Sequence, residues 1–132
     1  METDLTSRDP DRLAPLLLAY IGDAVYELKV REHLLRAGSA HMDQVHRQAV
    51  AYVRAERQSS LLGQLEGWLT QEEQTVFRHG RNAKSGHQPP HTSAAAYRRA
   101  TGLEALIGWL HLKGRQDRLA HIFSILFAEA EA

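Results

Sequence analysis

The sequence predicts an all-α fold, and two observations carry that prediction. Apolar residues recur three and four positions apart along most of the 132 residues, which is the spacing of one helix face. Alternating apolar and polar residues between turn signals, which mark β-strands, are almost absent. The length is that of one domain with a single core. We therefore expect about five to seven helices in one domain covering 1–132, with residues 1–10 flexible.

The first helix is expected at about 11–37. Pro15 lies close to its start, where a missing N–H does no harm, and Gly38 is a stop signal. Its expected core-facing stripe consists of Leu17, Ile21, Val25, Leu28 and Leu35. Apolar residues also occupy most of the opposite side. The helix should therefore be buried on more than one side, with another subunit covering the second.

The other helices are separated by short connections and by one long loop. They are expected at about 41–62, 70–79, 94–112 and 116–130. Thr70 and Glu73 form the capping box that begins the third helix. The expected core stripe of the fourth helix is Leu103, Leu106, Ile107 and Leu110. The basic loop 80–93 contains two glycines and two consecutive prolines, and long loops inside compact domains are often functional.

Net charge is zero, but basic residues gather in one interval of the chain. No acidic residue lies between Glu73 and Glu104. The cationic side chains of that interval are Arg78, Arg81, Lys84, Arg98 and Arg99. A neutral protein with one basic strip favours a localised anionic partner such as a phosphate backbone, although a solvated loop without a partner has the same composition.

Composition disfavours several other classes of protein. The chain has no cysteine, and therefore no disulfide, thiolate metal site or thiol nucleophile. No apolar run approaches the ~20 residues of a membrane span, and the acidic first dozen residues do not resemble a signal peptide. We expect a cytoplasmic protein without a membrane partner. The eight histidines lack the HExxH spacing, and no phosphate-loop or nucleophile-elbow motif occurs, which disfavours a histidine zinc site.

Two carboxylates stand on helices that are otherwise largely apolar. Asp23 follows Gly22 in the middle of the first helix, and Glu104 stands among small residues at the edge of a core stripe. Small residues at both places would let the two helices approach closely. Two carboxylates brought together in this way need a cation, and Mg²⁺ prefers such oxygen ligands. A helix cap or arginine partner for Asp23, or two unrelated surface acids, are the alternatives.

The segment "YIGDAVYE" around Asp23 and the segment "GLEALIGWL" around Glu104 resemble the ribonuclease III family. The "RNAKSG" segment and the pattern Tyr-Arg-x-x-Thr-x-x-Glu-Ala-Leu are similar to its bacterial Mini-ribonuclease III group. The resemblance covers about residues 13–128. It implies a ribonuclease III-type endonuclease domain, and the length leaves no room for a double-stranded-RNA-binding domain.

By this resemblance the protein is a homodimeric, Mg²⁺-dependent endoribonuclease that cleaves double-stranded RNA, typically at the ends of large-subunit (23S) ribosomal RNA. The resemblance makes Asp23 and Glu104 the catalytic metal ligands, and Glu27 could contribute through water. Two further acids of the larger family fall at Ala19 and Thr101, so metal should be held more weakly. A non-catalytic RNA-binding or ribosome-assembly module that keeps the fold is the alternative.

The resemblance also implies where RNA and a second subunit bind. Leu16 and Tyr20 are expected at the dimer interface, and packing of Tyr20 in the core of one subunit is the alternative. The residues expected to contact RNA phosphates are Arg78, Arg81, Asn82, Lys84, Arg98 and Arg99. Recognition would rest on A-form shape rather than on base sequence, and salt should weaken it strongly.

Overall fold

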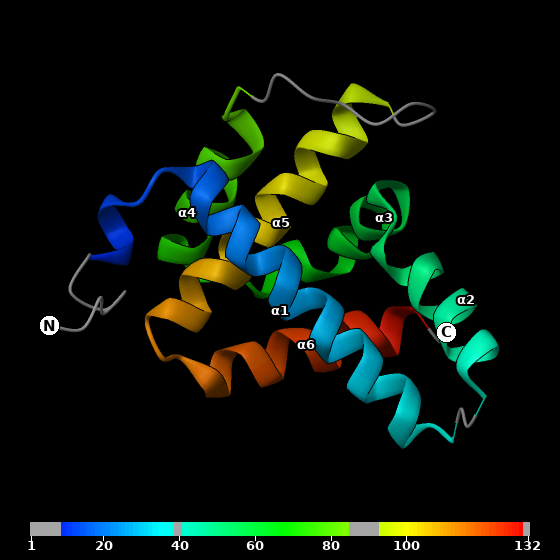
Figure 1. Ribbon diagram of the computed structural model, residues 1–132. Helices are drawn as coiled ribbons and strands as arrows, with labels where there is room; N and C mark the ends of the chain where they lie inside the picture. Colours follow the sequence, from blue (N-terminus) through cyan, green and yellow to red (C-terminus); the bar gives the residue numbers. More distant parts are fainter. Residues whose placement is uncertain (1–8, 39–40, 85–92, 131–132) are drawn as a thin grey trace, which may run out of the picture.

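The structure, a computed structural model, describes residues 9–38, 41–84 and 93–130, and within these ranges it consists of helices and connections (Figure 1). The α-helices are α1 (Pro15–Arg36), α2 (Met42–Val53), α3 (Ala55–Leu65), α4 (Gln71–Asn82), α5 (Ala94–Leu112) and α6 (Gln116–Ala130). Two 3-10 helices, η2 (Pro10–Arg12) and η3 (Glu66–Trp68), precede α1 and follow α3. The expected all-α fold is confirmed. None of the described helices combines the length and the apolar character that crossing a bilayer requires.

Helix α5 lies at the centre of the bundle, with α1, α3 and α4 packed around it (Figure 1). Its expected core residues are fully buried, namely Leu103, Leu106, Ile107 and Leu110. Helix α6 closes the bundle against α3 and α5 through Leu119, Ile122 and Leu126. Because α5 is surrounded by other helices, its half-buried Glu104 is a polar group inside an apolar layer.

The core-facing side of α1 differs from the prediction. Its buried residues are Leu18, Ala19, Gly22, Val25, Tyr26, Val30 and Leu34. Leu17, Leu28 and Leu35, expected in the core, are 53%, 56% and 62% exposed. The helix is apolar nearly all round, so periodicity alone does not tell its two apolar faces apart. The face that carries Gly22 packs on α5 because only that face permits a close approach.

The expected helix 41–62 is two helices in the structure. Arg54 has an extended backbone, with φ −64° and ψ 142°, and separates α2 from α3. The break contains neither glycine nor proline, so the sequence carries no signal for it. Helix α3 then continues past the expected end at residue 62, through Gly63, as far as Leu65.

Other expected helix ends are partly confirmed. Pro15 is the first residue of α1, and Gly38 has the left-handed φ of 99° that suits a stop signal. The residues before Pro15 form the separate helix η2 instead of extending α1. Helix α4 includes Gly80 and ends at Asn82, so the loop begins later than expected. The rest of that loop, 85–92, and the expected flexible residues 1–8 lie outside the described residues.

Candidate active site

Helices α1 and α5 touch backbone to backbone at Gly22 and Gly108. A Cβ added at Gly22 would overlap the carbonyl oxygen of Glu104, and one added at Gly108 would overlap the carbonyl oxygen of Leu18. Only glycine fits at either position unless a helix moves. Asp23 directly follows the glycine of α1, and Glu104 lies one turn before the glycine of α5. The crossing therefore brings the two carboxylates together, and the expected close approach is confirmed.

The pKa of Glu104 reports how near the two carboxylates are. Burial is the largest cause that raises the pKa of Glu104, to about 8, and the charge of Asp23 and a hydrogen bond with Asp23 raise it further. The charge of Glu27, one turn after Asp23, has a smaller effect in the same direction. The half-buried Glu104 and the exposed Asp23 repel each other when both are charged, so a cation beside them would be stabilised.

Gln58 belongs to this site, although the sequence pattern did not predict it. Its side chain is 1% exposed, and its Nε2 donates to Oε2 of Glu104 at 3.3 Å. This hydrogen bond opposes the rise in the pKa of Glu104 because it stabilises the carboxylate form. The only signal would have been a long polar side chain on the buried face of α3. That face could not be located because the break at Arg54 was not foreseen.

The donor set fits a divalent cation that protein and substrate hold together. Within the described ranges no three His, Asp or Glu side chains are arranged to hold a metal ion. Ala19 and Thr101, the positions of two further acids in the larger family, are both buried, and the Thr101 hydroxyl donates to the Tyr97 carbonyl at 2.9 Å. Two carboxylates are nevertheless enough for Mg²⁺, which keeps several waters and takes other oxygens from substrate phosphates.

The site lies within the part of the chain that matches a known protein family. The Ribonuclease III domain family matches residues 16–115, which include both carboxylates and both crossing glycines. This chain belongs to the ribonuclease III family. Mini-ribonuclease 3 of Symbiobacterium thermophilum is 46% identical over 114 residues, which cover 86% of this chain and 88% of that protein. Mini-ribonuclease 3 of Brevibacillus brevis is 42% identical over 131 residues, or 99% of this chain and 98% of that protein.

A solved structure supports the same assignment. The crystal structure of a Fusobacterium nucleatum protein superposes with a TM-score of 0.81 at 27% sequence identity, covering 92% of this chain and 98% of that one. The helical arrangement described above is therefore shared by a protein whose sequence differs at most positions. The chain is a ribonuclease III-family endoribonuclease similar to the Mini-ribonuclease III group.

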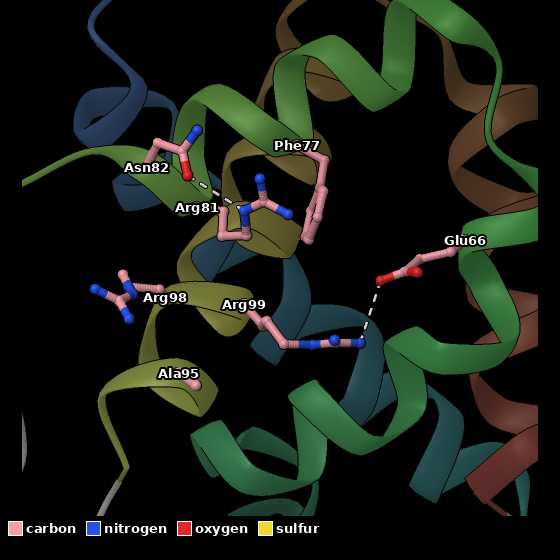
Figure 2. Close-up of a pocket in the computed structure, with 7 residues that line it drawn as sticks. All are labelled: Glu66, Phe77, Arg81, Asn82, Ala95, Arg98 and Arg99. Atoms are coloured by element: carbon pink, nitrogen blue, oxygen red, sulfur yellow. Dashed lines mark hydrogen bonds and ion pairs between the residues drawn. The ribbon is translucent and has the colours of Figure 1, made fainter.

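Four of the six residues expected to bind RNA lie around one cavity of about 370 Å³ (Figure 2). The cavity, here called the α4–α5 cavity, is lined by Glu66, Phe77, Arg81, Asn82, Ala95, Arg98 and Arg99. The Arg81 guanidinium lies 5.9 Å from the centre of the Phe77 ring, and Arg99 pairs with Glu66 at 3.2 Å. The other two expected residues, Arg78 and Lys84, are exposed and do not line this cavity.

The α4–α5 cavity does not face the carboxylate pair of this endoribonuclease. At about 100° per residue, Arg99 lies about 140° around α5 from Glu104, and Ala95 lies about 180° from it. Figure 2 views the cavity with α1 passing behind α5. The fold thus gathers most of the predicted basic residues, but on another side of α5.

The outer side of α1 is apolar and exposed. Tyr20 is 77% exposed, so the alternative that it packs in the core of its own subunit is wrong. Leu16, the second residue expected at a dimer interface, is 39% exposed. We use the name α1 outer face for Leu16, Leu17, Tyr20, Leu28 and Leu35. A row of large exposed apolar side chains of this kind marks an interaction surface.

Proposed function

We propose that this endoribonuclease cleaves double-stranded RNA in a Mg²⁺-dependent reaction at Asp23 and Glu104, and that it acts as a homodimer. We further propose that its substrate is a large-subunit (23S) ribosomal RNA precursor, which would place it in the cytoplasm. The observation that carries the proposal is the carboxylate pair at the crossing of α1 and α5.

The residues of the site have separate tasks in this mechanism. Asp23 and Glu104 would hold a cation that, when bound, supplies positive charge to activate water and stabilise the leaving oxygen. Glu104 keeps a proton near neutral pH, because its pKa is about 8, and gives it up when a cation binds. Gln58 holds Oε2 of Glu104 in place through its amide. Glu27 adds negative charge that favours a cation.

Two surfaces away from the carboxylate pair support a duplex substrate and a second subunit. The α4–α5 cavity presents Arg81 and Arg98, which suit contact with phosphates, although Arg99 is already paired with Glu66. The α1 outer face offers an apolar surface of the kind that two identical subunits cover mutually. A two-fold dimer would carry two carboxylate pairs, one for each strand of the duplex.

Cleavage of labelled duplex RNA by the purified protein in Mg²⁺ or in EDTA tests the proposal. The variants Asp23→Asn and Glu104→Gln each remove one charge and keep the shape of the side chain. We expect each to lower the cleavage rate by about a hundredfold or more, since each removes a metal ligand. RNA affinity measured in EDTA should stay close to that of the parent protein.

Asp117→Asn is the matched control, because it removes the same charge from an exposed position on α6. It should cleave at the parent rate. Undiminished cleavage by Asp23→Asn or Glu104→Gln would refute the site. Parent protein that binds duplex RNA and leaves it intact would instead fit a non-catalytic RNA-binding module. A 23S precursor with unprocessed ends, compared with an unrelated duplex, tests the ribosomal RNA part of the proposal.

A further inference from the structure

The corner between α2 and α3 carries basic residues that the sequence pattern did not single out. Helix α2 ends at Val53, and α3 begins at Ala55, with Arg54 in extended conformation between them. An open cavity of about 550 Å³ lies at this corner. The described residues that line it are Arg47, Val50, Ala51, Arg54, Arg57 and Ser60. Three of these are arginines and none is acidic; we call this surface the α2–α3 hollow.

The α2–α3 hollow adjoins the carboxylate pair. Gln58, whose amide donates to Glu104, directly follows Arg57 along α3. Arg54 is the N-cap residue of α3, and its carbonyl oxygen accepts a hydrogen bond from the Gln58 backbone N–H at 3.0 Å. Burial is the main cause that raises the pKa of Tyr26, while the charge of Glu104 raises it further and that of Arg57 lowers it. Helix α3 therefore carries both Arg57, which lines the hollow, and Gln58, which contacts Glu104.

Two of the three arginines of the hollow, Arg47 and Arg54, are available to an anionic ligand. Arg47 and Arg54 are exposed, and neither has an ion pair or a side-chain hydrogen bond with any residue in the described part of the chain. The α4–α5 cavity differs in two respects. Its Arg99 is paired with Glu66, and the cavity lies on another side of α5 from Glu104. Of the two basic surfaces, the α2–α3 hollow is therefore the one whose lining helix, α3, also contacts Glu104.

We propose that the α2–α3 hollow is a phosphate-binding subsite that holds the RNA strand beside the bond to be cleaved. The inference rests on the proposed function and adds the surface that places the substrate. Arginine suits this task because its planar guanidinium binds two phosphate oxygens at once. Arg47 and Arg54 stand about 10 Å apart along α2, so together they can contact more than one phosphate of a strand.

The double variant Arg47→Ala/Arg54→Ala tests the subsite through RNA binding. Affinity for duplex RNA is measured by fluorescence anisotropy in EDTA over a series of KCl concentrations. Each lost arginine–phosphate contact removes about one unit from the slope of log affinity against log salt. We expect a slope smaller by about 2 and an affinity about tenfold weaker at physiological salt. The double variant Arg47→Lys/Arg54→Lys keeps the charges and should restore the salt slope, with an affinity between those of the parent and the alanine variant because lysine does not bind two phosphate oxygens at once.

Arg12→Ala/Arg36→Ala is the matched control, because it removes the same charge from two exposed arginines of the N-terminal part. Its affinity and slope should equal those of the parent. An unchanged slope and affinity in Arg47→Ala/Arg54→Ala would overturn the subsite. If the parent cleaves RNA and this variant binds normally, only the subsite fails. If the parent does not cleave, the proposed function fails, and the binding curves still decide on the subsite.

Discussion

Glu104 has to satisfy two opposing requirements. It sits half-buried in the most enclosed helix of the bundle, where burial and the neighbouring Asp23 raise its pKa to about 8. In the proposed function it also has to be charged in order to bind a cation. Gln58 eases this conflict by donating a hydrogen bond to the carboxylate form. A carboxyl group that gives up a proton to a cation couples metal binding to pH.

The stability of the cation-free protein should fall as pH rises. The folded state keeps a proton on Glu104 up to about pH 8, whereas an unperturbed glutamate releases it near 4.5. The stability linked to this proton is complete below 4.5 and is lost as pH rises through about 8. We expect the Tm in EDTA to drop more in the parent than in Glu104→Gln between about pH 5 and about pH 9. Equal drops in Tm for the parent and Glu104→Gln would contradict the raised pKa of Glu104. Mg²⁺ should make the two drops in Tm more similar.

Gln58 should set how much Mg²⁺ the enzyme needs. Gln58→Leu keeps a side chain of similar size and removes the hydrogen bond to Glu104. The carboxylate form loses its donor, so we expect the Mg²⁺ concentration for half-maximal cleavage to rise by about three- to tenfold at neutral pH. Calorimetric titration with Mn²⁺ gives a second reading of metal affinity. Gln116→Leu, at an exposed position on α6, is the control and should leave both unchanged.

At the scale of elements, two helices, α1 and α4, come close to α5 through glycine positions. Gly22 and Gly108 permit the crossing of α1 and α5, and a Cβ on Gly80 of α4 would lie 3.0 Å from the Cα of Gly102 on α5. The crossing of α1 and α5 is the more demanding, because the neighbouring atoms are backbone and cannot rotate away. The geometry of the carboxylate pair therefore depends on glycine rather than on any polar contact.

Gly22→Ala should disturb both the fold and the site. The added methyl group would overlap the Glu104 carbonyl, so the helices have to separate, at about 3 kcal/mol or more of unfolding free energy. Cleavage should fall with it because the carboxylates move apart. Gly63→Ala is the control, since nothing lies within 4 Å of its Cβ inside α3. The free energy of unfolding of that variant, measured with urea, should rise by up to about 1 kcal/mol because alanine favours the helix. A Gly22→Ala variant with the stability and cleavage rate of the parent would contradict the close crossing of α1 and α5.

The capping box of α4 also serves as a cross-link to α6. Glu73 is 1% exposed and accepts from the Thr70 backbone N–H at 2.9 Å, as the sequence predicted. It also accepts two hydrogen bonds from Arg118, at 2.6 and 2.8 Å. Glu73→Ala should lower the unfolding free energy by about 3 kcal/mol, because it breaks a buried charge pair. Glu72→Ala, which breaks the exposed pair with Arg115, should cost less than about 1 kcal/mol in the same chemical unfolding experiment.

At the scale of the whole molecule, α1 serves two apolar surfaces. One packs on α5 and α2, and the α1 outer face is exposed in the single chain. Tyr20→Asp places a charge in the middle of that face. We expect it to convert a dimer into a monomer, as measured by light scattering on a sizing column, because a buried unpaired charge is costly. Trp68→Asp alters another exposed aromatic residue, on η3, and should leave the oligomeric state unchanged. A dimeric Tyr20→Asp would refute this interface.

The sequence by itself determined the fold class, most helix positions and the two carboxylates. Helical periodicity and capping residues are local signals, and Thr70, Pro15 and Gly38 fulfil them in the structure. The pairing of Asp23 with Glu104 also had a local signal, because glycines lie near both. Two small residues on different helices indicate a close approach even before the partner surface is known.

Only the tertiary structure decided which side of α1 faces the core and which basic residues adjoin the site. Both sides of α1 are apolar, so the choice depends on which one fits α5. The break at Arg54 has no local signal, and the helix that begins after it carries Gln58 to Glu104. The basic strip is continuous in sequence, but about 100° of rotation per residue carries Arg99 away from Glu104. Residues close in sequence on a helix can lie on opposite sides of it, and only the packing of the helices determines which of them lie near the site.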